Sequence, residues 1–195
     1  MNKKVKKILQ GLLFILIIIA FIYVGTKDFD TEVVIDNERF DQDYTNVSKD
    51  NVFKYVNAVE VYSMLNDNAI IFMGYPTNKW SGYYANILNE AAKASGIEEI
   101  LYYDFYDDRE NGNATYQSIV LSLTNYLLTL DDGSQEIYAP TLIIIKDGNI
   151  IGFDQETAFT KGNIDPEEYW DELRTGLKYN TFQTMFKEYL EWKDY

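Results

Sequence analysis

Hydrophobic residues along the chain fall into blocks whose spacing alternates between that of a strand and that of a helix. Residues 68–75, NAIIFMGY, form a continuous apolar run of strand length, which is typical of a strand covered on both faces of a sheet. A helix follows, beginning at Thr77 or Asn78 and ending at Gly96, because apolar residues recur there at spacings of three and four. Its apolar stripe consists of Trp80, Tyr84, Ile87, Leu88, Ala91 and Ala92.

The segments on either side of this strand and helix show the same two spacings. Before them, an extended stretch from Asn51 leads into a short helix at 58–65. After them, we expect a strand at 98–105, a loop at 107–113 and a second amphipathic helix at 114–130.

The last part of the chain contains a predicted hairpin and a helical end. Two β-rich runs in residues 138–155 are joined by Asp147-Gly148, a dipeptide that favours a type I′ turn. Asp165 and Pro166 suit the N-cap and first position of a helix, and Gly176 is expected to divide the terminal helical stretch in two. The order strand, helix, strand, helix, hairpin, helix predicts one mixed α/β sheet with helices on both faces.

A basic and then strongly apolar N-terminus precedes this domain. Four lysines lie within residues 1–7, and every residue from 12 to 24 is apolar. This pattern fits a signal peptide or an uncleaved signal anchor, and the absence of an Ala-x-Ala-like cleavage site favours the anchor. A buried core helix is a third alternative, which the asymmetric lysines disfavour. We therefore expect a cytoplasmic tip at 1–7, a transmembrane helix at 8–25, a polar extracytoplasmic stalk at 26–50 with a short strand at 32–35, and a folded domain at 51–195.

Composition narrows the chemistry of that domain. The 195 residues include no cysteine and no histidine, which excludes disulfides, thiolate nucleophiles, imidazole acid–base catalysis and zinc-finger ligands. Of the 17 basic residues, 13 remain beyond the four N-terminal lysines, against 31 acidic residues, so the exported part carries a formal net charge of −18. This charge disfavours nucleic acid and anionic lipid as partners. It is compatible with a cationic protein or peptide, although a solvated acidic surface needs no partner.

Clustered carboxylates in the second half of the chain raise the question of a calcium site. Asp104, Asp107, Asp108 and Glu110 lie close together in sequence. They lack the ligand spacing and the glycine position of an EF-hand loop. We therefore expect no metal ion and no cofactor.

Three stretches within residues 51–195 resemble proteins of the thioredoxin-like superfamily. Residues 72–93, FMGYPTNKWSGYYANILNEAAK, resemble the strand, loop and helix that carry the C-x-x-C motif. Residues 138–152, YAPTLIIIKDGNIIG, resemble the segment in which a cis-proline opens the fourth strand. Residues 101–111, LYYDFYDDREN, are similar to the strand and acidic loop of membrane-attached bacterial members of the bacteriocin-transport accessory type. The resemblance implies a thioredoxin-like mixed sheet flanked by helices.

The redox motif of that superfamily is absent from this chain. By the resemblance, its two cysteine positions fall on Asn78 and Ser81, giving Asn-Lys-Trp-Ser. Disulfide exchange needs a thiolate and a second thiol, and neither side chain supplies one. Thioredoxins also bury an acid six residues before the first cysteine, where this chain has Phe72. We therefore expect no catalytic residue.

The resemblance further implies a groove that holds an extended peptide by main-chain hydrogen bonds. The bond between Ala139 and Pro140 is expected to be cis. The alternative is that Pro140 shapes the sheet and Trp80 packs, with no ligand. The expected groove residues are Tyr75, Pro76, Trp80, Ala139, Pro140 and Thr141.

These observations predict a bacterial, Gram-positive cell-membrane protein with a cytoplasmic N-terminus. By the resemblance, its extracytoplasmic domain is a non-catalytic accessory module that binds exported proteins or peptides. Two alternatives stay open: an oxidoreductase relative that works through a partner's cysteines, and a purely structural membrane-proximal domain. The sequence predicts no nucleic-acid partner and leaves the partner's identity and the oligomeric state open.

Overall fold

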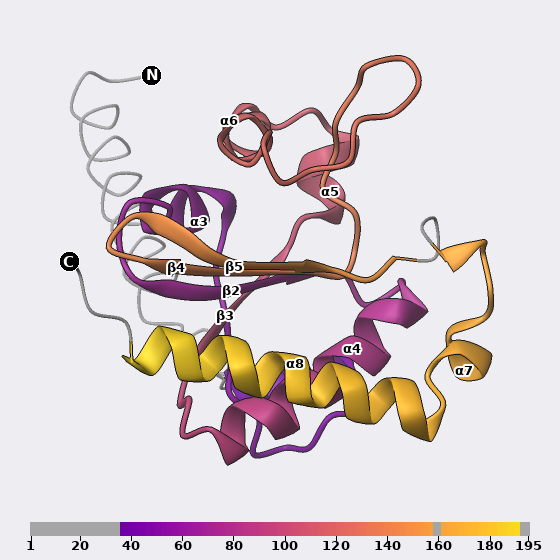
Figure 1. The fold of residues 1–195 in the computed structure, drawn as a ribbon. Helices are drawn as coiled ribbons and strands as arrows, with labels where there is room; N and C mark the ends of the chain where they lie inside the picture. Colours follow the sequence, from indigo (N-terminus) through magenta and orange to yellow (C-terminus); the bar gives the residue numbers. More distant parts are fainter. Residues whose placement is uncertain (1–35, 158–160, 192–195) are drawn as a thin grey trace, which may run out of the picture. The chain divides into compact units, whose positions relative to one another are not determined.

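The computed structural model describes residues 36–157 and 161–191 (Figure 1). The chain divides into one unit at Met1–Val34 and a second at Ile35–Tyr195, and all described residues belong to the second unit. The predicted cytoplasmic tip, the transmembrane helix at 8–25 and the short strand at 32–35 lie outside the described residues. Within the described part, no helix has the length and apolar character needed to cross a membrane.

A five-stranded mixed sheet forms the centre of the described domain. Its strands lie in the order β1-β3-β2-β4-β5. The first three run parallel to one another, β4 runs antiparallel to β2, and β5 runs antiparallel to β4. The predicted mixed α/β sheet is thereby confirmed. The strands are β1 (Phe53–Tyr55), β2 (Ala69–Gly74), β3 (Ile100–Asp104), β4 (Thr141–Lys146) and β5 (Asn149–Gln155).

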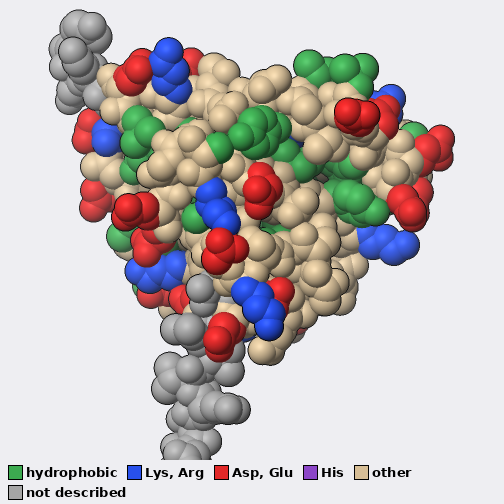
Figure 2. All heavy atoms as spheres, turned by 90° about the horizontal axis from the view of Figure 1, so that it is seen from below, with side chains coloured by type: hydrophobic (Ala, Val, Ile, Leu, Met, Phe, Trp, Pro, Cys, Tyr) green, Lys and Arg blue, Asp and Glu red, His purple; other side chains and the backbone are tan. Residues whose placement is uncertain are grey.

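Helices cover both faces of this sheet, as the sequence pattern predicts. They are α2 (Asp36–Asp43), α3 (Ala58–Met64), α4 (Lys79–Ala94), α5 (Tyr106–Glu110), α6 (Ala114–Ser122), α7 (Pro166–Tyr169) and α8 (Glu172–Glu191). In Figure 1, α3, α5 and α6 lie above the sheet, and α4 and α8 lie below it. Figure 2 shows the face below the sheet, on which acidic and basic side chains interleave around apolar ones.

The central strand β2 is buried along its whole length. Ile70 and Phe72 belong to the hydrophobic cluster that α4 and α8 share with the sheet. Ile71 and Met73 belong to the cluster on the opposite face, beneath α3 and α6. Because successive side chains of a strand point to opposite faces, one apolar run supplies both cores.

The predicted boundary between stalk and domain at Asp50 is wrong. The part of that stalk which the structure describes folds onto the sheet, beginning with α2. Phe40 and Tyr44 are 0% and 3% exposed, and the Phe40 ring stacks on Phe53 of β1 at 4.0 Å. Asp36 accepts a hydrogen bond from the Tyr55 amide of the same edge strand at 3.2 Å. Most residues of this segment are polar, so the sequence pattern did not predict that Phe40 and Tyr44 are buried.

The predicted loop at 107–113 contains a short helix, and the predicted helix at 114–130 ends early, at Ser122. Asp104 accepts a hydrogen bond from the Tyr106 amide at the start of α5. Beyond α6, the Gln135 side-chain amide donates to the carbonyl oxygens of Thr124 and Leu127 at 2.9 and 3.3 Å. A residue distant in sequence thus satisfies carbonyl groups that a continuing helix would have used.

The C-terminal helices also break at a different place from the predicted one. Helix α8 passes through Gly176 without interruption, and the chain leaves helical geometry at Trp170 instead. Phe182 and Phe186 on α8 are fully buried against the sheet and α4. Tertiary packing of this kind outweighs the weak helix propensity of one glycine.

The predicted hairpin turn between β4 and β5 is confirmed. Asp147 and Gly148 have φ values of 50° and 71°, the two positive values that a type I′ turn requires. The turn is anchored because the Gly148 amide donates to the Asp67 carbonyl at 3.1 Å and the Asp147 amide donates to Asn68 Oδ1 at 2.8 Å.

Two glycines provide a matched test of how closely α8 packs on the sheet. A Cβ at Gly152 of β5 would lie 2.8 Å from Met185 Cε and 3.2 Å from Ile144 Cβ, so we expect Gly152→Ala to lower the free energy of unfolding by about 1–3 kcal/mol. Gly176 has no atom within 4 Å of that position, and Gly176→Ala should raise the same quantity by about 0.5–1 kcal/mol. Urea denaturation measures both, and equal effects of the two substitutions would contradict this packing.

Candidate functional site

The carboxyl end of β2 leads directly into α4, and the residues of this junction pack tightly. Asn78 is the N-cap of α4, since its Oδ1 accepts the Ser81 amide hydrogen at 3.0 Å. Ser81 is fully buried, and a Cβ on Gly74 would lie 2.9 Å from Ser81 Oγ. Asn78 and Ser81 therefore act as a helix cap and a packed residue in this structure.

The chain before β4 lies beside this junction. The bond between Ala139 and Pro140 is cis, as expected. Met73 pairs with Thr141 in the antiparallel ladder of β2 and β4, and continuing that register places Tyr75 opposite Ala139. We name this place, where Tyr75 faces Ala139, the carboxyl edge of the sheet.

Most polar groups around Ala139 already make hydrogen bonds within the domain. Thr141 Oγ1 donates to the Tyr138 carbonyl at 2.6 Å, and the Gln155 side-chain amide donates to Thr141 Oγ1 at 2.8 Å. The Glu156 amide donates to the Pro140 carbonyl at 3.4 Å. The amide and carbonyl of Ala139, in contrast, hydrogen-bond no other described residue. The main chain of Ala139 thus has no hydrogen-bond partner among the described residues, and the residue as a whole is 3% exposed.

The prediction that Trp80 lines an open groove is wrong. Its side chain is only 4% exposed, because Tyr169 and Trp170 at the end of α7 cover it, with ring centroids 4.8 and 6.0 Å away. Sequence alone could not show that this distant segment returns to α4.

The other predicted groove residues divide into two groups. Ala139, Pro140 and Thr141 come together, but all three residues are buried, so their side chains offer no recognition surface. Tyr75 and Pro76 are half-buried and supply the side-chain surface at the carboxyl edge.

Two residues that sequence reasoning missed extend this surface. Tyr106 packs on Tyr75 with a centroid distance of 5.1 Å and is 42% exposed. The Arg109 guanidinium lies 5.5 Å from the centroid of the Tyr75 ring and 5.7 Å from that of Tyr106. Both residues belong to α5, which the sequence pattern predicts as a loop. The signal available in the sequence was a tyrosine followed three residues later by an arginine, a spacing that places both on one face of a helix.

The ionisable groups nearest to Ser81 offer no acid–base chemistry at neutral pH. Tyr44 and Tyr102 lie in the core beneath α4, and their hydroxyl groups share a hydrogen bond of 2.9 Å. Burial raises the pKa of both phenols well above the usual value. Phe72 lies in the same cluster, so no carboxylate stands behind Ser81 at that position.

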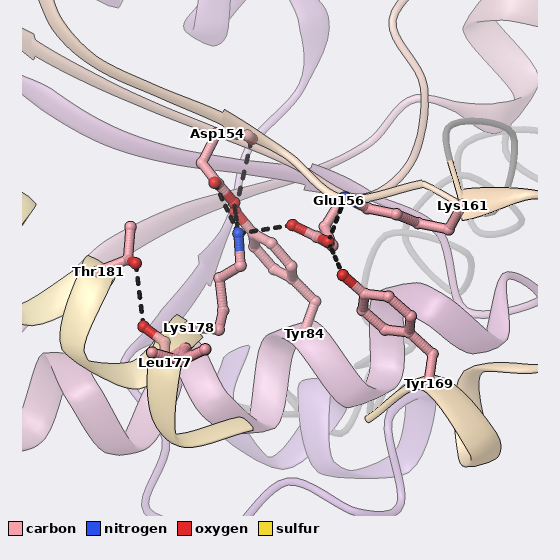
Figure 3. Close-up of polar contacts among 8 residues, drawn as sticks. All are labelled: Tyr84, Asp154, Glu156, Lys161, Tyr169, Leu177, Lys178 and Thr181. Atoms are coloured by element: carbon pink, nitrogen blue, oxygen red, sulfur yellow. Dashed lines mark hydrogen bonds and ion pairs between the residues drawn. The ribbon is translucent and has the colours of Figure 1, made fainter. Parts of the chain in front are cut away.

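A second constellation, buried charges between β5 and α8, is the strongest polar cluster among the described residues (Figure 3). Lys178 Nζ lies 2.7 and 2.8 Å from the two carboxylate oxygens of Asp154 and 2.7 Å from Glu156 Oε2. The side chains of Lys178, Asp154 and Glu156 are 11%, 17% and 10% exposed. We call these three residues the ionic cluster.

Neighbouring elements complete the hydrogen bonding of the ionic cluster. Tyr84 of α4 donates to Asp154 Oδ2 at 2.6 Å, and Tyr169 of α7 donates to Glu156 Oε1. Lys161 also reaches Glu156 Oε1, at 3.0 Å. In Figure 3 these side chains converge from the strand, α4, α7 and α8 on the two carboxylates.

The electrostatics of the ionic cluster fit a structural role. Burial opposes ionisation of Glu156, but hydrogen bonds from Lys178 and Tyr169 and the charge of Lys178 outweigh it, so the pKa of Glu156 is lowered. Burial and the bond to Glu156 raise the pKa of Tyr169 to about 12. A cluster with paired charges and engaged hydroxyls is suited to fixing helices, since no group stands free to attack or protonate a substrate.

Metal binding has no support among the described residues, in which no group of three or more carboxylates is arranged around a possible ion. The acids at 104–110 are engaged separately. Asp104 accepts a hydrogen bond from the Tyr106 amide, and Asp108 accepts hydrogen bonds from Tyr103 and Asn113 at 2.6 and 2.7 Å.

Comparisons with known proteins add no relative. No protein-family model matches the chain, and the search of curated proteins returned no match.

Removing the cation of the ionic cluster tests its structural role. Lys178→Met keeps a long unbranched side chain but leaves two buried carboxylates without their shared partner, so we expect the free energy of unfolding at pH 7 to fall by about 3–5 kcal/mol. Lys187→Met, at an exposed position of the same helix, is the control and should change stability by less than about 0.5 kcal/mol. A loss of similar size in both variants would contradict the assignment.

The pH dependence of stability provides a second test of the cluster. Because the folded-state pKa of Glu156 is lowered, its contribution is fully present above the unfolded-state value of about 4.3 and is lost as the pH falls through the folded-state pKa. In Lys178→Met the stabilising partner is gone, so the stability deficit against wild type should shrink between pH 7 and pH 4. Denaturation at both pH values measures this, and a deficit that stays constant or grows would count against it.

Proposed function

We propose that this protein is a membrane-anchored, extracytoplasmic thioredoxin-like domain without redox chemistry, which binds extended segments of exported proteins or peptides. The topology supports the thioredoxin-like assignment. Three parallel strands in the order β1-β3-β2, followed by the antiparallel β4 and β5, match what the resemblance implies. The proline before β4 and the helix directly after β2 occupy the expected places.

The N-terminal sequence supports the proposed location. Four lysines ahead of an uninterrupted apolar stretch orient such a segment with its basic end in the cytoplasm. The acidic domain would then lie outside the cell, tethered to the membrane.

The absence of suitable side chains supports a role without catalysis. The sequence contains no cysteine and no histidine, and Ser81 is buried as a packed residue. A serine hydroxyl without a neighbouring base is a poor nucleophile.

The observation that carries the binding role is the main chain of Ala139, which hydrogen-bonds no other described residue. A free amide and carbonyl on an extended segment can pair with an incoming strand, as in β-strand addition. Tyr75, half-buried and opposite Ala139, supplies an aromatic surface for a side chain of that strand.

Substitution of Tyr75 tests the binding role. Peptides selected on the wild-type protein from a random decapeptide library should bind Tyr75→Ala at least about tenfold more weakly, a loss of about 1.4 kcal/mol, because an aromatic contact is removed. Tyr62→Ala removes an exposed tyrosine from α3, which precedes the amino end of β2, and should leave the affinity unchanged. Equal affinities for wild type and Tyr75→Ala, with unfolding curves that also agree, would refute the role.

An insulin-reduction assay separates this proposal from the oxidoreductase alternative. We expect the rate of disulfide reduction with the protein and dithiothreitol to equal the rate with dithiothreitol alone, because the chain holds no thiol. A reproducible acceleration would favour the oxidoreductase alternative.

A further inference from the structure

Charge is distributed unevenly over the described domain. From Asp104 to Pro140 the chain carries seven acidic residues and one basic residue, Arg109. Helix α8, in contrast, carries three of each sign, and the face that it shares with α4 is mixed (Figure 2). The seven acids lie in two groups, one at residues 104–110 on and beside α5 and one at residues 131–136 in the segment that leads into the carboxyl edge.

Several of these acids lie on the surface around the carboxyl edge. Asp104, Asp107 and Glu110 are exposed on or beside α5, whose Tyr106 packs on Tyr75. Glu136 is exposed three residues before Ala139. An extended ligand at Ala139 would lie between these two sources of negative charge.

The single cation in this region does not offset them. Arg109 Nε lies 3.1 Å from Glu110 Oε1, so its charge is already paired. Its side chain is 21% exposed, and its guanidinium sits between the rings of Phe105 and Tyr106 at 5.5 and 5.7 Å. It orders the aromatic surface and leaves the other carboxylates unbalanced.

The charges around the carboxyl edge also act on Tyr138, the residue before Ala139. Burial, then the charges of Glu136 and Asp132, raise the pKa of Tyr138, although Arg109 lowers it.

We propose that the ligand of the carboxyl edge is a cationic extended peptide, in which lysine or arginine residues flank an apolar residue. The main chain of Ala139 pairs with the peptide, and the rings of Tyr75 and Tyr106 receive the apolar side chain and the stem of a neighbouring lysine or arginine. The exposed acids of α5 and Glu136 select the charge. This inference rests on the proposed function and adds the class of peptide to it.

Three labelled peptides of identical length test the proposal: Lys-Val-Lys-Val-Lys-Val, Glu-Val-Glu-Val-Glu-Val and Gln-Val-Gln-Val-Gln-Val. Fluorescence anisotropy is measured with the full chain in non-ionic detergent at 50 and 300 mM NaCl. We expect the lysine peptide to bind at least about tenfold more tightly than the glutamate peptide at low salt, and this preference to narrow at high salt.

Charge-neutralising variants locate the effect. Asp107→Asn and Glu136→Gln should each weaken binding of the lysine peptide about two- to fivefold, whereas Glu188→Gln on α8 should leave it unchanged. An equal effect of all three variants would show that the overall net charge, and not the carboxyl edge, attracts the peptide, and would overturn the inference.

The binding measurements distinguish a wrong charge preference from the absence of peptide binding. If the glutamine or glutamate peptide binds as tightly as the lysine peptide and Tyr75→Ala weakens it, the selectivity is wrong and the peptide-binding role stands. If no peptide binds, or if Tyr75→Ala changes nothing, both the inference and the proposed function fail.

Discussion

The ammonium group of Lys178, held between Asp154 and Glu156, is the interaction on which the arrangement of the C-terminal half depends. The carboxylates of Asp154 in β5 and of Glu156, directly after that strand, cannot be buried side by side without a cation, and α8 supplies it. Tyr84 and Tyr169 then tie α4 and α7 to the same carboxylates. As a result α7 is fixed over Trp80, and the chain itself covers this residue at the start of α4.

Tyrosine hydroxyl groups make many of the side-chain hydrogen bonds inside the described domain. Four tyrosines donate hydrogen bonds to carboxylates in the described domain, and a fifth and sixth, Tyr44 and Tyr102, bond to each other beneath α4. Each ring fills apolar volume while its hydroxyl satisfies a buried acceptor. The 17 tyrosines are thereby explained largely by packing. The tyrosine–carboxylate pairs are Tyr55–Asp43, Tyr84–Asp154, Tyr103–Asp108 and Tyr169–Glu156.

The sheet and its order could be predicted because local signals specified each strand. The run before Gly74 is apolar at every position, and Asp147-Gly148 permits only a tight turn. What escaped prediction depends on contacts between distant segments. Trp80 is buried because α7, more than 80 residues away, covers it. The ion pair between Lys178 and Asp154 of β5 produces no periodic pattern in the sequence from which it could be predicted. The cis bond before Pro140 was therefore predicted correctly, whereas the burial of Trp80 was not predicted.

The buried tyrosines also determine how the domain exchanges protons with its surroundings. No side chain of the sequence has an ordinary pKa near neutrality, and several phenols that would ionise first on the alkaline side are shifted upward by burial. Between about pH 6 and pH 9 such a domain takes up and releases almost no protons, so it has almost no buffering capacity there. The net charge of the domain therefore stays nearly constant while the pH drifts across this range.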